Sequence, residues 1–175
     1  MSSGTGFSSW NLESEIYSAI ERKGWIEPTS IQLEAIPIAR KGLDLVGQAR
    51  TGSGKTAAFG IPVLEKCSKK DSIQALILCP TRELAVQVAE EMNTLQGNKG
   101  LNIQTVYGGV DLEKQAKKLS EGVQIVVGTP GRVIDMTKRK HLNLDEVEIF
   151  CLDEADRMLD MGFLPDVLWI FEKMT

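Results

Sequence analysis

A glycine-rich run in the first third of the chain has the residue types and spacing of a phosphate-binding loop. It reads Ala49, Arg50, Thr51, Gly52, Ser53, Gly54, Lys55 and Thr56, the phosphate-loop pattern with alanine in place of the first glycine. The two later glycines allow a close backbone approach, so that amides at the start of a following helix can bind phosphate oxygens. Lys55 would contact the β- and γ-phosphates, and the Thr56 hydroxyl would bind Mg²⁺.

We therefore expect these eight residues to bind a nucleotide. The alternative is a glycine-rich turn that matches the pattern by accident. Average residue frequencies put that at roughly one chance in a hundred for a chain of this length. The expected position of the run, between an apolar strand and a helix, favours the nucleotide interpretation further.

Two carboxylates follow an apolar run late in the chain. Asp153 and Glu154 come directly after residues 149–152. An aspartate that ends a buried strand can hold Mg²⁺ through the metal's water shell, and Glu154 is then the candidate general base that polarises an attacking water. The alternative is an acidic first turn that complements the dipole of the next helix. The position of the pair, three crossovers after a phosphate loop, favours the catalytic interpretation.

These motifs need a scaffold, and the hydrophobic pattern predicts an α/β one. Apolar runs typical of buried strands cover residues 43–47, 75–79, 103–107, 125–128 and 149–153. Helical patterns separate them, most clearly at Leu84, Val88, Met92 and Leu95. Alternating strands and helices indicate right-handed crossovers and a mostly parallel sheet with helices on both faces. Ligands of such sheets bind at the carboxyl ends of the strands, where every motif lies.

The first forty residues carry two further helical patterns. Leu12, Ile16, Ala19 and Ile20 repeat at helical spacing before Gly24, and a second helix is expected over about residues 30–40. We see no internal repeat and no linker.

Length and charge limit the class of protein. The chain has 175 residues, 24 acidic and 20 basic, and 42% of its residues are hydrophobic, which is typical of one globular domain. A net charge of −4 argues against coating of nucleic acid by bulk charge. No membrane-length apolar run and no secretory signal are seen, and three cysteines form no metal-ligand spacing. We therefore expect a cytoplasmic protein, with the nucleus or an organelle also open, and no membrane partner.

Together the motifs resemble those of the DEAD-box RNA helicases, whose name is the one-letter reading of residues 153–156. Residues 24–32 look like the family's Q motif, and Phe7 lies where the family has an isolated aromatic. Residues 80–85 look like motif Ia, residues 108–109 like the glycine doublet and residues 129–132 like motif Ib. The resemblance implies a RecA-like P-loop domain. Residues 1–40 would be a Q-motif region packed on the core, and residues 41–175 an ATP-binding core.

The resemblance implies ATP and Mg²⁺ as cofactors. Gln32 would pair with adenine N6 and N7, because an amide carries both a donor and an acceptor. Trp25 could stack on the base or pack under the Q-motif loop, which Phe7 is expected to support. Arg50 replaces a common glutamine of the family. It would add a charge near the nucleotide or face solvent.

The resemblance also implies that the sugar–phosphate backbone of RNA is a ligand. The residues assigned to it follow strands at one sheet edge: Pro80, Thr81, Arg82, Gly108, Gly109, Thr129, Pro130, Gly131 and Arg132. Amides, hydroxyls and guanidinium groups at helix starts suit phosphates and carry no base sequence. Each stretch alone could be a turn with a helix cap, and only the ensemble indicates RNA.

Nothing in the chain resembles the family's Ser-Ala-Thr motif, and no second RecA-like domain follows. In related folds the strand before that motif lies between the phosphate-loop strand and the Asp153 strand. We therefore expect an incomplete first domain with a gap in its sheet, which favours dimerisation, strand exchange or low stability. A second RecA-like domain of the full-length protein would be a partner.

The function implied is that of an ATP-dependent RNA helicase that unwinds RNA duplexes or remodels RNA–protein complexes. The isolated chain is expected to have little activity. Two alternatives stay open at this point: a stand-alone nucleotide- or RNA-binding module without turnover, and an unrelated P-loop NTPase such as a nucleotide kinase.

Overall fold

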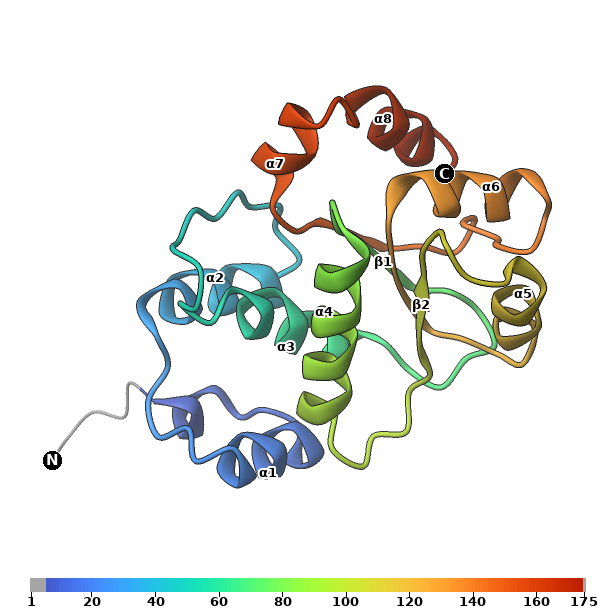
Figure 1. Cartoon of the computed structure of the whole chain (residues 1–175). Helices are drawn as coiled ribbons and strands as arrows, with labels where there is room; N and C mark the ends of the chain where they lie inside the picture. The colour runs from blue at the N-terminus through green and yellow to red at the C-terminus, as the bar shows by residue number, and fades with distance from the viewer. Residues whose placement is uncertain (1–5, 175) are drawn as a thin grey trace, which may run out of the picture. The chain divides into compact units, whose positions relative to one another are not determined.

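Four short parallel strands form the sheet of the computed structural model, which describes residues 6–174 (Figure 1). They are β1 (Ala75–Leu78), β2 (Ile103–Val106), β3 (Ile125–Gly128) and β4 (Ile149–Leu152), in the spatial order β2-β3-β1-β4. The register pairs Leu78 with both Gly128 and Leu152, and Val106 with Gly128. The carboxyl ends of the four strands therefore lie level at one edge of the sheet.

Helices follow each strand and cover the sheet. They are α4 (Arg82–Leu95) after β1, α5 (Leu112–Ser120) after β2, α6 (Pro130–Lys138) after β3, and α7 (Ala155–Asp160) and α8 (Leu164–Glu172) after β4. All residues of β1 and β3 are buried, as befits the two central strands. The hydrophobic core of this region joins strand residues such as Leu76 and Val126 to Met136 of α6 and Ile170 of α8.

The chain divides into two compact units. One consists of Met1–Lys66 and Glu91–Gly100, and the other, called here the sheet unit, consists of Cys67–Glu90 and Leu101–Thr175. The first, called here the helical unit, contains the 3-10 helix η1 (Phe7–Trp10), α1 (Ser14–Arg22), α2 (Ser30–Arg40) and α3 (Lys55–Lys66). The division at residue 40 stays a prediction.

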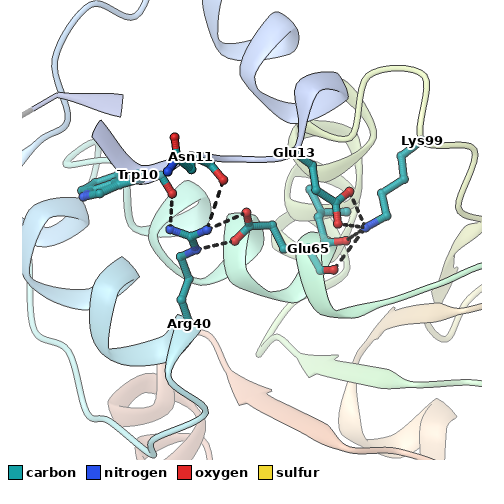
Figure 2. A network of polar contacts seen from close by, with 7 residues as sticks. Trp10, Asn11, Glu13, Arg40, Glu65 and Lys99 are labelled. Carbon is teal, nitrogen blue, oxygen red and sulfur yellow. Dashed lines mark hydrogen bonds and ion pairs between the residues drawn. The ribbon is translucent and has the colours of Figure 1, made fainter. Parts of the chain in front are cut away.

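A network of ion pairs and hydrogen bonds ties the helical unit together (Figure 2). Arg40, at the end of α2, pairs with Glu65 of α3 at 2.8 Å and donates to the carbonyls of Trp10 and Asn11. The Lys99 ammonium donates to the last carbonyls of α3 and pairs with Glu13 at 2.8 Å. A cation at a helix C-terminus satisfies carbonyls that lack intrahelical partners. The far end of the helix that begins at the phosphate loop is therefore fixed.

The predicted strand at residues 43–47 is wrong. The structure assigns these residues to no strand or helix, and every one of them is exposed, with Val46 fully so. An apolar run forms a strand only where its N–H and C=O groups meet a neighbouring strand. Within residues 6–174, none pairs with this run. The other four predicted strands are confirmed to within one residue, and the helix over residues 30–40 is confirmed.

Candidate nucleotide and RNA sites

The predicted phosphate loop forms a tight turn that opens α3. The Ser53 amide donates to the Arg50 carbonyl at 3.2 Å, and Gly52 and Gly54 take φ values of +78° and +83°. These left-handed conformations are why glycine stands at both positions. Lys55 is the first residue of α3 and is half-buried, whereas Arg50 and Gly52 are exposed. Arg50 thus faces solvent, and the loop leads directly into a helix N-terminus, as phosphate binding requires.

Gln32 links the predicted adenine site to the phosphate loop. Its side chain is buried, its Oε1 accepts from the Thr29 amide at 3.0 Å, and its Nε2 donates to the Gly54 carbonyl at 3.1 Å. The first bond satisfies an amide at the start of α2, as in a capping box. The second holds the last loop residue before Lys55. One side chain therefore fixes the Q-motif region and the phosphate loop together.

Phe7 and Trp25 pack on each other rather than standing apart. Their ring centroids lie 6.3 Å apart in a stacked arrangement, and Phe7 meets Trp10 edge to face at 5.6 Å. Phe7 is buried, and the Lys23 ammonium lies 4.8 Å from the centroid of the Trp25 ring. Such contacts stabilise the loop before α2. This arrangement supports the packing interpretation of Trp25, and its stacking on a base stays a prediction.

Asp153 and Glu154 lie at the end of β4. Asp153 is buried, and its amide donates to the Leu78 carbonyl at 2.9 Å, which anchors it to the neighbouring strand. Glu154 adopts the left-handed region at φ 55° and ψ 52°, and its carboxylate lies 3.6 Å from the Arg157 guanidinium. A non-glycine residue in this region carries backbone strain, which is found disproportionately at functional positions.

Two thiols next to these carboxylates are kept protonated. Burial raises the pKa of Cys151 to about 12 and that of Cys79 still further, and in each case the nearby Asp153 charge adds to the effect. A thiolate is the reactive form of cysteine. These thiols are therefore packing groups.

The residues predicted to bind RNA converge on one edge of the sheet. Residues 108–109 follow β2, residues 129–132 follow β3 and residues 80–82 follow β1, and these three strands are neighbours. Asp153 follows β4, the next strand along. The four motifs thus stand in a row, all within the sheet unit.

The two arginines of this edge have different surroundings. The Arg82 guanidinium lies over the ring of Tyr107, 4.8 Å from its centroid, and is exposed. Arg132 is half-buried and donates through Nη1 and Nη2 to the Val110 carbonyl at 3.2 and 3.1 Å. Its Nη1 also donates to Oε1 of Gln115 at 3.0 Å. Arg132 is therefore engaged within the protein, whereas Arg82 presents its charge outward.

Comparison with known proteins decides the family. The family model described as DEAD/DEAH box helicase matches residues 29–175. The chain belongs to the DEAD/DEAH box helicase family. It is 50% identical over 169 residues to the DEAD-box ATP-dependent RNA helicase CshA of Streptococcus pneumoniae, covering 96% of this chain and 32% of that protein.

Two further relatives agree with this family. The ATP-dependent RNA helicase CshA of Listeria monocytogenes is 48% identical over 171 residues, which cover 97% of this chain and 33% of that protein. A crystal structure of a DEAD box protein from the hyperthermophile Methanococcus jannaschii superposes with a TM-score of 0.93 at 48% identity, covering 97% of this chain and 47% of that one. The chain spans about a third of the length of the curated relatives that it matches.

For this helicase-family chain, sequence reasoning missed Gln115. It is a buried side chain on α5, and besides accepting from Arg132 it donates from Nε2 to the Tyr107 carbonyl at 3.1 Å. A signal was present, because Gln115 lies one position before Ala116 on the apolar face that Leu112 and Leu119 define. A polar residue on the buried face of a helix needs a hydrogen-bond partner.

The described part of the chain holds neither a cluster of three or more metal-ligating side chains nor a helix long and apolar enough to cross a membrane. The predicted Mg²⁺ ligands, Thr56 and Asp153, are a hydroxyl and a carboxylate. This donor set fits Mg²⁺, which is commonly held by one or two carboxylates together with water and substrate phosphates.

Proposed function

We propose that this chain binds ATP and the RNA backbone as part of an ATP-dependent RNA helicase that unwinds RNA duplexes or remodels RNA–protein complexes. The observation that carries the proposal is the row of motifs at the carboxyl ends of β2, β3, β1 and β4. Ligands of parallel sheets bind at this edge. The relatives named as ATP-dependent RNA helicases support the same function.

ATP is the proposed nucleotide because Gln32 has capacity left for adenine. An amide oxygen accepts two hydrogen bonds and an amide nitrogen donates two. One of each is used on Thr29 and Gly54, so Oε1 can accept from adenine N6 while Nε2 donates to N7. Guanine presents an acceptor, O6, where adenine presents the N6 donor. Gln32 would therefore favour ATP over GTP.

Hydrolysis would use the predicted catalytic residues Lys55, Asp153 and Glu154. A water oxygen attacks the γ-phosphorus as the bond to the ADP oxygen breaks, and Glu154 accepts the water proton. Lys55 would offset the negative charge on the β- and γ-phosphates. Thr56 and Asp153 would hold Mg²⁺, which neutralises charge on the phosphates when bound.

The test is a comparison of ATP hydrolysis, with and without RNA, by this chain and by one extended through a second RecA-like domain. We expect weak nucleotide binding and little RNA-stimulated turnover from the chain alone. Arginine fingers of the second domain contribute roughly 10³–10⁵ in rate in such enzymes. Robust RNA-stimulated turnover by a monodisperse monomer of the short chain would overturn the proposal that turnover needs the second domain. Its absence in the extended chain would overturn the helicase function.

The two alternatives give different results in the same assay. A stand-alone binding module would bind nucleotide or RNA without gaining turnover on extension. A nucleotide kinase would transfer phosphate to a nucleoside monophosphate, and membership of the helicase family argues against it. We also propose that the protein acts in the cytoplasm. Imaging of a tagged full-length protein would test this location.

We further propose that the chain alone dimerises or exchanges strands through β4. This strand is at the edge of the sheet, and Leu152 is partly exposed. The amides of Ile149 and Asp153 donate toward β1, so the alternating amides of Phe150 and Leu152 point to the open side. Unpaired strand edges are templates for another chain.

Light scattering over a concentration series tests this edge. We expect wild-type chain to dimerise with a concentration-dependent mass, and Leu152→Lys to remain monomeric because an edge lysine opposes pairing. Leu159→Lys on α7 is the matched control, since its side chain is also exposed but lies outside the strand. A monomer at high concentration with a high unfolding midpoint would contradict the proposal.

A further inference from the structure

The loop between β2 and α5, which carries the glycine doublet, is held by side chains at both of its ends. Gln115 donates to the Tyr107 carbonyl before the doublet, and Arg132 donates twice to the Val110 carbonyl after it. Arg132 and Gln115 are themselves joined at 3.0 Å. The clamp formed by Arg132 and Gln115 therefore connects both ends of the loop to α5 and α6.

The loop needs such support because its own residues provide little. Gly108 and Gly109 are exposed, and Gly109 has φ +83°. A glycine pair loses more conformational entropy on ordering than any other dipeptide, so without external bonds it would sample many backbone states. Charge-assisted bonds from a guanidinium are among the stronger hydrogen bonds in proteins.

Arg82 provides the contrast within the same edge. Within residues 6–174, its guanidinium makes no hydrogen bond and stands over the Tyr107 ring. A Cβ built on Gly109 would lie 3.8 Å from its Nη1. Arg82 thus has its donors available beside the doublet, while Arg132 directs three donor interactions to groups within the protein.

We propose that Arg132 is a positioning residue: with Gln115 it fixes the glycine-doublet loop in the conformation that binds RNA phosphates, and Arg82 supplies the phosphate contact. This inference rests on the proposed binding of the RNA backbone. It predicts that the geometry of Arg132, rather than its charge, determines affinity. Lysine at position 132 keeps the charge but cannot donate from a rigid fork to two acceptors.

The salt dependence of RNA binding distinguishes the two roles. For single strands, the slope of log Kobs against log salt becomes shallower by about 0.7 for each phosphate that the protein no longer neutralises. The test is the binding of a fluorescein-labelled oligouridylate decamer to the chain, followed by anisotropy from about 20 to 150 mM salt. Arg82→Gln should flatten the slope by about 0.7. Arg132→Gln and Arg132→Lys should each weaken binding about tenfold with the wild-type slope.

Gln115→Leu removes the other half of the clamp at nearly constant volume. It should weaken binding as much as Arg132→Gln, and the double variant should be no weaker than either single one, because both substitutions release the same loop. Wild-type affinity in Arg132→Lys, together with a slope flattened by about 0.7 in Arg132→Gln, would show that Arg132 contacts a phosphate directly. That result would overturn the proposal.

Amide hydrogen exchange without RNA provides the second readout. Both Arg132 variants should exchange faster across residues 107–111, with unchanged protection of β1 and β3. Unchanged exchange in the loop would overturn the clamp. If the wild-type chain fails to bind the decamer at any salt concentration, the proposed RNA function fails, and exchange in the loop still decides whether Arg132 and Gln115 fix it.

Discussion

Residues 43–54 and 149–154 have the same sequence pattern and different structures. Each is an apolar run followed by residues predicted to act on the nucleotide. In the second, β4 pairs with β1 along its whole length and delivers Asp153 with its amide bonded to Leu78. In the first, the apolar run is exposed outside any strand, and the loop is held by the Gln32 side chain.

The difference shows that an apolar run and a strand partner are separate requirements. Burial of side chains favours a strand, but each backbone N–H and C=O must also be paired. The run at 149–152 is half-buried except for exposed Leu152 and pairs with β1 on one side, whereas the run at 43–47 is exposed and has no strand partner within residues 6–174. The residues predicted to be catalytic at the end of β4 are thus anchored by main-chain bonds, and those of the phosphate loop by the Gln32 side chain and the start of α3.

The largest expected effect is on the rate of ATP hydrolysis, through Glu154 at the end of β4. Glu154→Gln in the full-length protein should lower kcat for RNA-stimulated ATP hydrolysis by about 10²–10⁴-fold, the usual range for removal of a general base. Binding of ATP should be unchanged, because the shape of the side chain is retained. Steady-state turnover and a nucleotide titration measure the two quantities. Asp160→Asn, an exposed acid at the end of α7, is the control, and undiminished turnover in the glutamine variant would remove Glu154 from the mechanism.

A stability comparison would test the structural contrast directly. Leu76→Ala, in buried β1 opposite Phe150, should cost about 2–5 kcal/mol of unfolding free energy. Val46→Ala, in the exposed run, should change it by less than about 0.5 kcal/mol. Urea unfolding of the chain measures both. A comparable loss at Val46 would mean that residues 43–47 are a buried strand in solution.

The same contrast explains how much of the fold the sequence could predict. Strands whose neighbours are present were found to within one residue, because their apolar runs are backed by backbone pairing. The run at 43–47 has the composition of a strand, and composition cannot report whether a partner strand is available. Its assignment failed for that reason.

The candidate sites could likewise be predicted only in part from the sequence. Spacing placed Arg132 at the correct sheet edge, but it could not show that the guanidinium turns inward to Val110 and Gln115. Likewise, the pattern identified both Gln32 and Gly54, and the bond between these residues, 22 positions apart, depends on the packing of α2 with α3. Local patterns predict the position of a residue along the fold, whereas its hydrogen-bond partners depend on tertiary structure.

Substitutions of two glycines in the phosphate loop test how Gln32 is coupled to that loop. Gly52→Ala meets no atom within 4 Å and should lose about 1 kcal/mol, the cost of a left-handed alanine. Gly54→Ala carries the same cost, and its Cβ would lie 2.4 Å from Nε2 of Gln32. It should therefore lose about 1–2 kcal/mol more, through displaced hydrogen bonds.

Fluorescent ATP and GTP titrations, with urea unfolding of each variant, check this prediction. Gly54→Ala should lower the preference for ATP because it displaces the Gln32 amide that is predicted to bind adenine, and Gly52→Ala should leave that preference unchanged. An equal effect on both would indicate that Gln32 is not coupled to the loop.

A pH effect of about 2 kcal/mol on stability is expected from the Cys151 thiol in β4. The pKa of Cys151 is raised to about 12 in the folded chain by burial and by Asp153, while an unfolded thiol titrates near a pKa of about 8.5. The native state therefore binds more protons at alkaline pH. The contribution of the thiol is complete below about pH 8.5 and is lost as pH rises toward about 12.

Urea unfolding at about pH 8 and pH 10 measures this loss in wild type and in Cys151→Ala. The alanine variant should lose less stability between the two pH values, by about 2 kcal/mol. Identical losses would mean that the thiol ionises equally in both states.

The smallest expected effect concerns the left-handed backbone conformation of Glu154, which should lower the stability of the folded chain. Glu154→Ala and Glu154→Gly both remove the carboxylate and its exposed contact with Arg157, so their difference isolates the left-handed conformation. That conformation costs a non-glycine residue about 1–2 kcal/mol, of which glycine's greater unfolded-state entropy offsets about 0.5–1. The glycine variant should thus be more stable than the alanine variant by about 0.5–1 kcal/mol in urea unfolding, and neither should hydrolyse ATP in the full-length protein. Equal midpoints would show that the position is unstrained. A glycine variant that is more stable but inactive would instead show two things. The end of β4 holds Glu154 in a conformation that lowers stability, and Glu154 is needed for hydrolysis, as expected of strain at a functional site.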